Sequence, residues 1–185
     1  MRVTGGTARG LNLASPKAQG VRPTTDRVRA ALFNIMSRFS IENSIVADLF
    51  AGTGSLGIEA LSRGAKQVDF IEENRRQIEV IRTNLHFTGF SNFATLYHGT
   101  VETCLPRLQP YDIMLMDPPY TKPFPKAILT SIGELGLLKN KGVLVCGHSS
   151  RIEINKNYGT LECWDNRRYG DSSLAFFSYR QEDAK

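Results

Sequence analysis

The spacing of apolar residues along the chain changes near residue 44. Before this point, residues 2–13 contain two short extended pieces around glycines, which predict a small hairpin. Apolar side chains then recur at helical spacing and predict an amphipathic helix over residues 26–38. Beyond residue 44, short apolar runs alternate with amphipathic stretches. This alternation predicts an α/β fold with a mostly parallel sheet and right-handed crossovers.

The predicted elements follow one another without a repeat or a second globular unit. Strands are expected at 44–50, 67–71, 93–97, 111–116 and 142–146, and helices at 55–63, 74–87, 101–108 and 124–138. Two later strands, 160–164 and 172–179, would add an antiparallel hairpin at one edge of the sheet. We therefore expect an amino-terminal extension over residues 1–40 and a main domain over residues 41–185.

The composition is that of a globular domain. The chain has 185 residues, 41% of them hydrophobic and 22% charged, which is enough to form a sizeable core. No apolar run has the roughly 18–20 residues of a membrane span and no signal peptide is visible, so we expect a cytoplasmic protein without membrane contact. The cysteines and histidines are scattered, so no metal site is expected.

Positive charge gathers at the amino-terminal end. The net charge is +5, and residues 1–40 hold seven basic residues against Asp26 alone, so the rest of the chain is close to neutral. A basic end on a near-neutral body indicates a surface that binds a polyanion such as RNA. A solvated charged face is the alternative.

A glycine-rich turn follows the strand predicted at 44–50. Residues Gly52 to Gly57 match the pattern G-x-G-x-x-G, in which glycines let the backbone turn tightly and approach a ligand. Glu72 ends the next predicted strand, where its carboxylate can accept hydrogen bonds from both hydroxyls of a ribose. The pattern predicts a nucleoside site, and both a nicotinamide dinucleotide and S-adenosylmethionine would fit it.

Asp48 favours S-adenosylmethionine over a nicotinamide cofactor. Its carboxylate would repel the pyrophosphate that lies against this turn in dinucleotide folds. The ammonium of S-adenosylmethionine can instead pair with Asp48, directly or through water. The alternatives are that Asp48 is a helix-capping or loop acid and that Glu72 is an exposed charge paired with Arg75 or Arg76. Glu73 could also bind the ribose, but Glu72 is favoured because it lies at the end of the predicted strand.

A second motif, Asp117-Pro118-Pro119-Tyr120, follows the strand predicted at 111–116, at the end where open α/β sheets bind ligands. Asp117 and the Pro118 carbonyl can accept both N–H bonds of an exocyclic amine and direct its lone pair at a methyl donor. Tyr120 can stack on the base, which is worth about 1–3 kcal/mol. The motifs together predict methyl transfer to a base nitrogen; a proline-rich loop with an exposed tyrosine is the alternative.

These residues resemble the class I methyltransferases, and specifically the bacterial small-subunit ribosomal RNA guanine-N2 methyltransferases of the RsmD type. The resemblance is carried by Gly5–Gly10, Arg22–Asn34, Asp48–Gly57, Glu59–Gly64, Asp117–Tyr120 and Tyr169–Ser172. It implies a Rossmann-like sheet of seven strands, mostly parallel, with helices on both faces. It also implies a monomer that uses S-adenosylmethionine and no metal to methylate guanine N2 in 16S ribosomal RNA, within a small-subunit particle or assembly intermediate.

The motifs and the resemblance together give three sets of expected site residues. The catalytic residues are Asp117, Pro118 and Tyr120. The cofactor contacts are Asp48, Phe50, Gly52, Gly54, Glu72, Thr100, Val101 and Asp117. The RNA contacts are Arg9, Arg22, Thr24, Arg27, Arg29 and Tyr120, with the extension also closing over the cofactor.

Two positions depart from the family pattern, and several functions stay open. Many relatives carry Asp or Asn at Thr100, where the adenine amine binds, and Glu at Gly147. The alternatives are an adenine-N6 methyltransferase, a glutamine-amide methyltransferase, a catalytically silent RNA-binding assembly module and a nicotinamide oxidoreductase.

Overall fold

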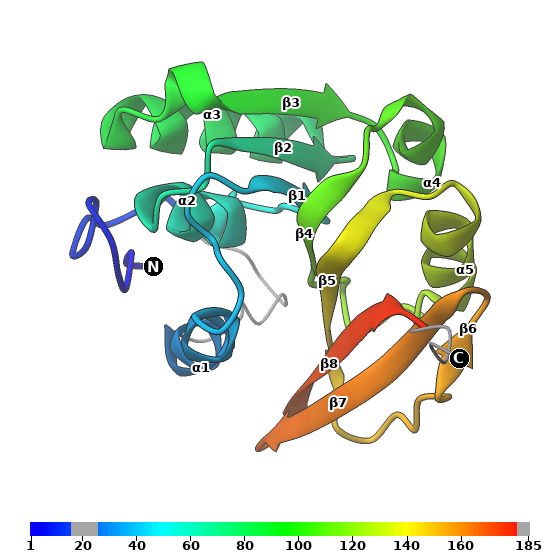
Figure 1. The fold of residues 1–185 in the computed structure, drawn as a ribbon. Coiled ribbons are helices and arrows are strands. Elements are labelled where there is room, and N and C mark those ends of the chain that lie inside the picture. Colours follow the sequence, from blue (N-terminus) through cyan, green and yellow to red (C-terminus); the bar gives the residue numbers. More distant parts are fainter. Residues whose placement is uncertain (16–25, 181–185) are drawn as a thin grey trace.

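The computed structural model describes residues 1–15 and 26–180 and contains one mixed sheet of eight strands in the order β3-β2-β1-β4-β5-β8-β7-β6 (Figure 1). The strands are β1 Ile45–Leu49, β2 Gln67–Glu72, β3 Ala94–His98, β4 Tyr111–Met116, β5 Leu138–Ser149, β6 Asn157–Tyr158, β7 Leu161–Tyr169 and β8 Ser172–Tyr179. Strands β1 to β5 run parallel to one another, and β8, β7 and β6 continue the sheet from β5 in antiparallel order. The predicted α/β fold with a terminal antiparallel hairpin is confirmed.

Helices cover both faces of the sheet. They are α1 Asp26–Met36, α2 Ser55–Ser62, α3 Arg75–Thr88, α4 Val101–Cys104 and α5 Lys126–Glu134, with short 3₁₀ turns η1 Ser91–Phe93 and η2 Leu105–Arg107. One core cluster joins α1, α2 and α3 to the sheet through residues such as Leu32, Ile58 and Ile81. The other joins α4 and α5 through Val101 and Leu129. The parallel strands are therefore buried between two layers of helices.

Several elements differ from the predicted ones: β5 and β7 are longer than the strands predicted at 142–146 and 160–164, and the helix predicted at 101–108 is α4 followed by η2. The sheet has eight strands instead of seven, because β6 contributes two residues that pair with Leu161 and Glu162. The helix predicted to reach residue 138 ends at Glu134, since Gly136 takes a left-handed φ of 65° and β5 begins at Leu138. The expected amino-terminal hairpin is a loop closed by an isolated bridge between Arg2 and Asn12.

The amino-terminal loop packs against α2 and the glycine turn (Figure 1, blue). The backbone N–H of Thr7 donates to the Ser62 carbonyl at 2.7 Å, and the amide of Ala8 donates to the Ser62 hydroxyl at 2.9 Å. The Asn84 side chain on α3 donates to the carbonyl oxygens of both Ala14 and Thr53. Residues 1–15 are therefore fixed to the elements that carry the first motif.

Arg29 does not lie on the RNA-binding surface expected for it. Its side chain on α1 is buried, and its guanidinium pairs with Glu59 of α2 at 3.7 Å and donates to the Arg2 carbonyl. Glu59 also accepts from the Thr4 amide and hydroxyl, each at 2.7 Å, and pairs with Arg63 at 2.8 Å. The prediction that Arg29 contacts RNA is therefore wrong, because a buried carboxylate neutralises this charge inside the fold.

Candidate active site

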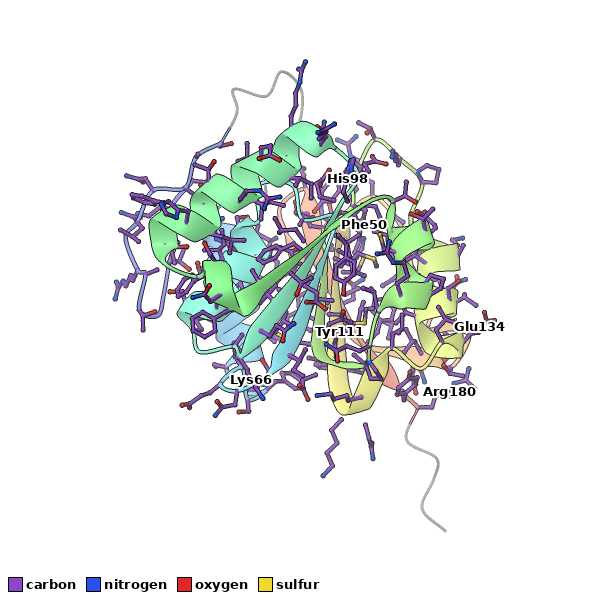
Figure 2. All side chains as sticks on the ribbon, turned by 90° about the horizontal axis from the view of Figure 1, so that it is seen from above. Phe50, Lys66, His98, Tyr111, Glu134 and Arg180 are labelled. Atoms are coloured by element: carbon purple, nitrogen blue, oxygen red, sulfur yellow. The ribbon has the colours of Figure 1, made fainter. Side chains whose placement is uncertain are left out.

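The two sequence motifs meet at one edge of the sheet. Strands β1, β2 and β4 are parallel neighbours, so their carboxyl ends point the same way. Figure 2 shows Phe50 and His98, at the carboxyl ends of β1 and β3, on one edge, with Lys66 and Tyr111 on the opposite edge. The loops after the three strands therefore face the same space, as expected for ligand sites in open α/β sheets.

A cavity of about 1770 Å³ opens at this edge. It is larger than the roughly 300–1,000 Å³ of an ordinary small-molecule site, so it has room for a nucleoside cofactor and a substrate base together. Predicted site residues that line it are Asp48, Phe50, Gly52, Glu72, Thr100, Val101, Asp117, Pro118 and Tyr120. Gly54 is buried behind the glycine turn, where it forms the N-cap of α2 with a φ of 78°.

Asp48 is a buried carboxylate with one oxygen engaged. Its Oδ2 accepts a hydrogen bond from the Gly57 amide at 2.8 Å, while Oδ1 has no hydrogen-bond partner among the described residues. Burial raises the pKa of Asp48 well above its usual range, and the nearby charges of Asp117 and Glu72 raise it further, against the lowering effect of the Gly57 hydrogen bond. An uncompensated buried carboxylate is costly, so a cation beside Oδ1 would be strongly favoured.

Glu72 is held in place by the backbone on both sides. Its Oε2 accepts from the Gly52 amide at 2.8 Å, and its Oε1 accepts from the Asn74 amide at 2.8 Å. Each carboxylate oxygen can accept more than one hydrogen bond, so the side chain remains able to bind hydroxyl groups. Glu73 also lines the cavity, but it is exposed and pairs with Lys122 at 3.2 Å.

The glycine turn depends on close packing and on an unusual backbone conformation. A Cβ added at Gly57 would lie 2.3 Å from the Phe70 ring, so only glycine lets α2 approach β2 this closely. Phe50 has a φ of 63°, in the left-handed region where a non-glycine residue costs on the order of 1–3 kcal/mol. The flanking Ala51 amide donates to the Ile71 carbonyl at 3.0 Å and so helps to hold this turn against the sheet.

Thr100 and Val101 form the wall beyond β3. Thr100 is the N-cap of α4, and its hydroxyl accepts from the Thr103 amide at 3.3 Å. Val101 is buried and presents an apolar surface to the same cavity. A threonine hydroxyl that already serves as a cap can accept one further hydrogen bond from a ligand amine.

Asp117 directly follows β4 and lies beside a glycine of the neighbouring strand. A Cβ at Gly147 would lie 2.5 Å from Asp117 Oδ1, so the absence of a side chain leaves space for this carboxylate. Burial raises the pKa of Asp117 to about 6. The carboxylate is therefore ionised at neutral pH but close to its titration range, which suits a group that accepts hydrogen bonds or a proton.

Tyr120 reaches from the second motif to the β7–β8 hairpin. Tyr120 is 42% exposed, and its hydroxyl lies near the Ser172 side chain. Burial of the hydroxyl and the Asp117 charge raise the pKa of Tyr120 to about 12, so the phenol is neutral at physiological pH. The ring therefore borders the cavity and stays partly exposed.

The remaining predicted RNA contacts are only partly described. Arg9 is exposed on the amino-terminal loop. Arg22 and Thr24 lie outside the described residues, as does the side chain of Arg27.

The described residues contain no cluster of three or more metal-ligating side chains. None of the described helices is long and apolar enough to cross a membrane.

Several cavity residues were missed by the sequence analysis. Phe124 follows the second motif and packs edge-on against His148 at 5.7 Å between ring centroids. Arg168 and Ser172 come from the tip of the β7–β8 hairpin. The run from Tyr169 to Ser172 was part of the family resemblance, so a signal existed there, although it did not indicate a contact with the second motif.

Comparison with known proteins finds relatives along nearly the whole chain. A family model described as conserved hypothetical protein 95 matches residues 1–178. Ribosomal RNA small subunit methyltransferase D of Haemophilus influenzae is 32% identical over 184 residues, covering 97% of this chain and 92% of that protein. The Escherichia coli K12 protein of the same name is 31% identical over 144 residues, covering 78% of this chain and 72% of that protein.

Solved structures agree with these relatives. The Escherichia coli protein yhhF, provisionally described as a methyltransferase, has a TM-score of 0.85 at 27% identity, with 97% of each chain covered. HI0767 of Haemophilus influenzae, provisionally described as a methylase, has a TM-score of 0.80 at 26% identity, covering 97% of this chain and 98% of that chain. The chain therefore belongs to the family described as conserved hypothetical protein 95, the RsmD-type methyltransferases.

Proposed function

We propose that this protein transfers a methyl group from S-adenosylmethionine to the exocyclic N2 of a guanine in small-subunit ribosomal RNA. The observation that carries the proposal is that Asp117 lines the same cavity as Asp48 and Glu72. Methyl transfer to a base requires a nucleoside pocket beside a carboxylate that can receive an amine. Two relatives named ribosomal RNA small subunit methyltransferase D support the choice of RNA.

The polar groups of the cavity fit S-adenosylmethionine. Asp48 offers a buried oxygen without a partner to the ammonium of the cofactor or to a bridging water. Glu72, held by two backbone amides, would accept the ribose hydroxyls, which favours it over the exposed, paired Glu73. Thr100 and Val101 would border the adenine. When bound, the cofactor supplies a methyl group that its sulfonium already activates.

Asp117 would bind and orient the target amine. The lone pair of an exocyclic guanine nitrogen is delocalised into the ring, which makes this nitrogen a poor nucleophile. Hydrogen bonds from its two N–H groups to Asp117 and to the Pro118 carbonyl would hold the nitrogen pyramidal. Asp117 is ionised at neutral pH because its pKa is about 6. After transfer, the extra proton on the nitrogen leaves to Asp117 or to water.

Most of the rate gain would come from orientation and from exclusion of water. Tyr120, which lines the cavity with Asp117, would stack on the guanine and hold its plane beside that carboxylate. The guanine must leave its stack to reach this position, which costs a few kcal/mol unless the RNA already presents it unstacked. Loops and junctions of ribosomal RNA offer such bases.

The proposed substrate also sets the cellular context. A ribosomal RNA substrate would place the protein in the cytoplasm, acting as a monomer on a small-subunit particle or an assembly intermediate. Arg9 and the basic residues of the extension would strengthen RNA binding independently of base sequence, and this affinity would decrease as the salt concentration increases.

The test is methyl incorporation from labelled S-adenosylmethionine into 16S RNA transcripts and into 30S particles that lack the modification. Calorimetry of cofactor binding accompanies it. Cofactor binding together with incorporation into either RNA substrate would support the proposal. Cofactor binding without incorporation into any RNA would contradict it and favour a silent assembly module or another substrate.

A further inference from the structure

The tip of the β7–β8 hairpin is built against the catalytic edge of the sheet. Ser172 pairs with Ser149 at the end of β5, and the Ser150 amide donates to the Asp171 carbonyl at 2.9 Å. Tyr169 packs against the core beneath the hairpin. Figure 1 shows the hairpin (orange to red) running along β5. The tip is therefore held at the end of β5, two residues beyond Gly147, which lies next to Asp117.

The same tip lines the cavity and contacts the second motif. Residues 168–172 all border the cavity that contains Asp117 and Pro118. Ser172 and Tyr120 line this cavity together, and the Ser172 side chain lies near the Tyr120 hydroxyl. The hairpin thus lies on the substrate side of the proposed site, whereas Asp48 and Glu72 lie at the ends of β1 and β2. A nucleotide whose base reached Asp117 would place its backbone near the mouth that this hairpin borders.

Two adjacent arginines on β7 differ in their partners. Arg167 pairs with Asp165 at 2.7 Å and does not line the cavity. Arg168 is exposed, lines the cavity and makes no ion pair with any described residue. Its Nε donates to the Gly170 carbonyl at 3.0 Å, which anchors the guanidinium to its own turn. The remaining N–H groups of Arg168 can therefore donate hydrogen bonds to a ligand. Two parallel N–H groups of a guanidinium match the spacing of two phosphate oxygens.

We propose that Arg168 binds a phosphate group beside the target nucleotide and thereby contributes affinity for the RNA strand at the cavity that Asp117 lines. This inference rests on the proposed function and adds the residue that engages the RNA backbone at the site. Glu153, Asp171, Lys122 and Lys126 line the same cavity, so its charge is mixed, and Lys122 pairs with Glu73 at 3.2 Å.

The test compares Arg168→Ala with Arg167→Ala, a neighbouring arginine of the same hairpin. Methyl transfer to 16S RNA transcripts and unmodified 30S particles is measured at several KCl concentrations, with cofactor affinity measured by calorimetry. Arg168→Ala should raise the KM for RNA by about tenfold, as expected for losing a charge-assisted hydrogen-bond pair. It should reduce the salt slope by about 0.7, the value for one phosphate of single-stranded RNA.

The other measurements separate this role from a structural one. Cofactor affinity, kcat at saturating RNA and the melting temperature should stay at wild-type values in Arg168→Ala, and Arg168→Lys should recover part of the RNA affinity. Equal KM values and salt slopes for Arg168→Ala and Arg167→Ala would overturn the inference. Weakened cofactor binding by Arg168→Ala would also overturn it, since Arg168 would then serve the cofactor. A wild-type protein that methylates no RNA would instead overturn the proposed function.

Discussion

Gly147→Ala should displace the proposed catalytic carboxylate while leaving Asp48 and Glu72, the acids proposed to bind the cofactor, in place. A Cβ at this position would lie 2.5 Å from Asp117 Oδ1, whereas carbon and oxygen atoms normally approach to about 3.3 Å. Asp117 would therefore have to move by roughly 0.8 Å. Misplacement by about 1 Å can cost on the order of 100-fold in rate, so kcat should fall by about that factor.

The backbone conformation at Gly147 gives no reason to expect that Gly147→Ala would lower the folding stability. Gly147 lies in β5 away from the left-handed region, and replacing a strand glycine by alanine normally gains about 0.5–1 kcal/mol. Any destabilisation would therefore report the contact with Asp117. In an Asp117→Ala background this contact is absent, so adding Gly147→Ala should raise the melting temperature.

The assay is single-turnover methyl transfer at saturating RNA, with cofactor affinity measured in parallel by calorimetry. The reasoning predicts a large loss of rate with an unchanged cofactor Kd. Two results would refute it: a Gly147→Ala rate close to wild type, or an equal loss of stability in the wild-type and Asp117→Ala backgrounds. Either would mean that Asp117 does not need the space beside Gly147.

Three further predictions concern buried charges. Because the pKa of Asp117 is raised to about 6, kcat/KM should fall tenfold per pH unit below pH 6, and a pH-rate profile without this limb would exclude Asp117 as the acceptor. Asp48→Asn should weaken cofactor binding in calorimetry yet stabilise the cofactor-free protein at pH 7. A carboxyl group whose pKa is raised by folding destabilises the folded protein as the pH rises above the pKa that the group has in the unfolded chain, and the neutral amide of asparagine removes this penalty. A lower stability of Asp48→Asn at pH 7 would contradict this prediction. Glu59→Ala should cost about 3–5 kcal/mol in urea unfolding, because it leaves Arg29 buried without its carboxylate, and a loss below 1 kcal/mol would show that the pair is dispensable.

The sequence predicted the layout of the fold well, because strand and helix periodicities are strong where the elements are long. The parallel strands, the terminal hairpin and the placement of both motifs at strand ends all agree with the structure. β6 was missed since two residues carry no periodicity. The end of α5 was misplaced because Leu137 and Leu138 continue an apolar pattern past Gly136, where the backbone turns.

The site was less accessible to sequence reasoning, because its contacts join distant segments. Arg29 was assigned to the surface since nothing local shows that Glu59, thirty positions along the chain, neutralises it in the core. The left-handed backbone of Phe50 has no signature in residue type. The contact of Gly147 with Asp117 arises only when β4 and β5 pair side by side.

The most direct test of the central claim is the identity of the methylated nucleoside. Unmodified 30S particles and 16S transcripts would be methylated with labelled S-adenosylmethionine by the wild-type protein and by Asp117→Ala, digested, and resolved by liquid chromatography and mass spectrometry. The account predicts label in N2-methylguanosine for the wild-type protein and none for the variant. Label in N6-methyladenosine, or equal labelling by the variant, would contradict it.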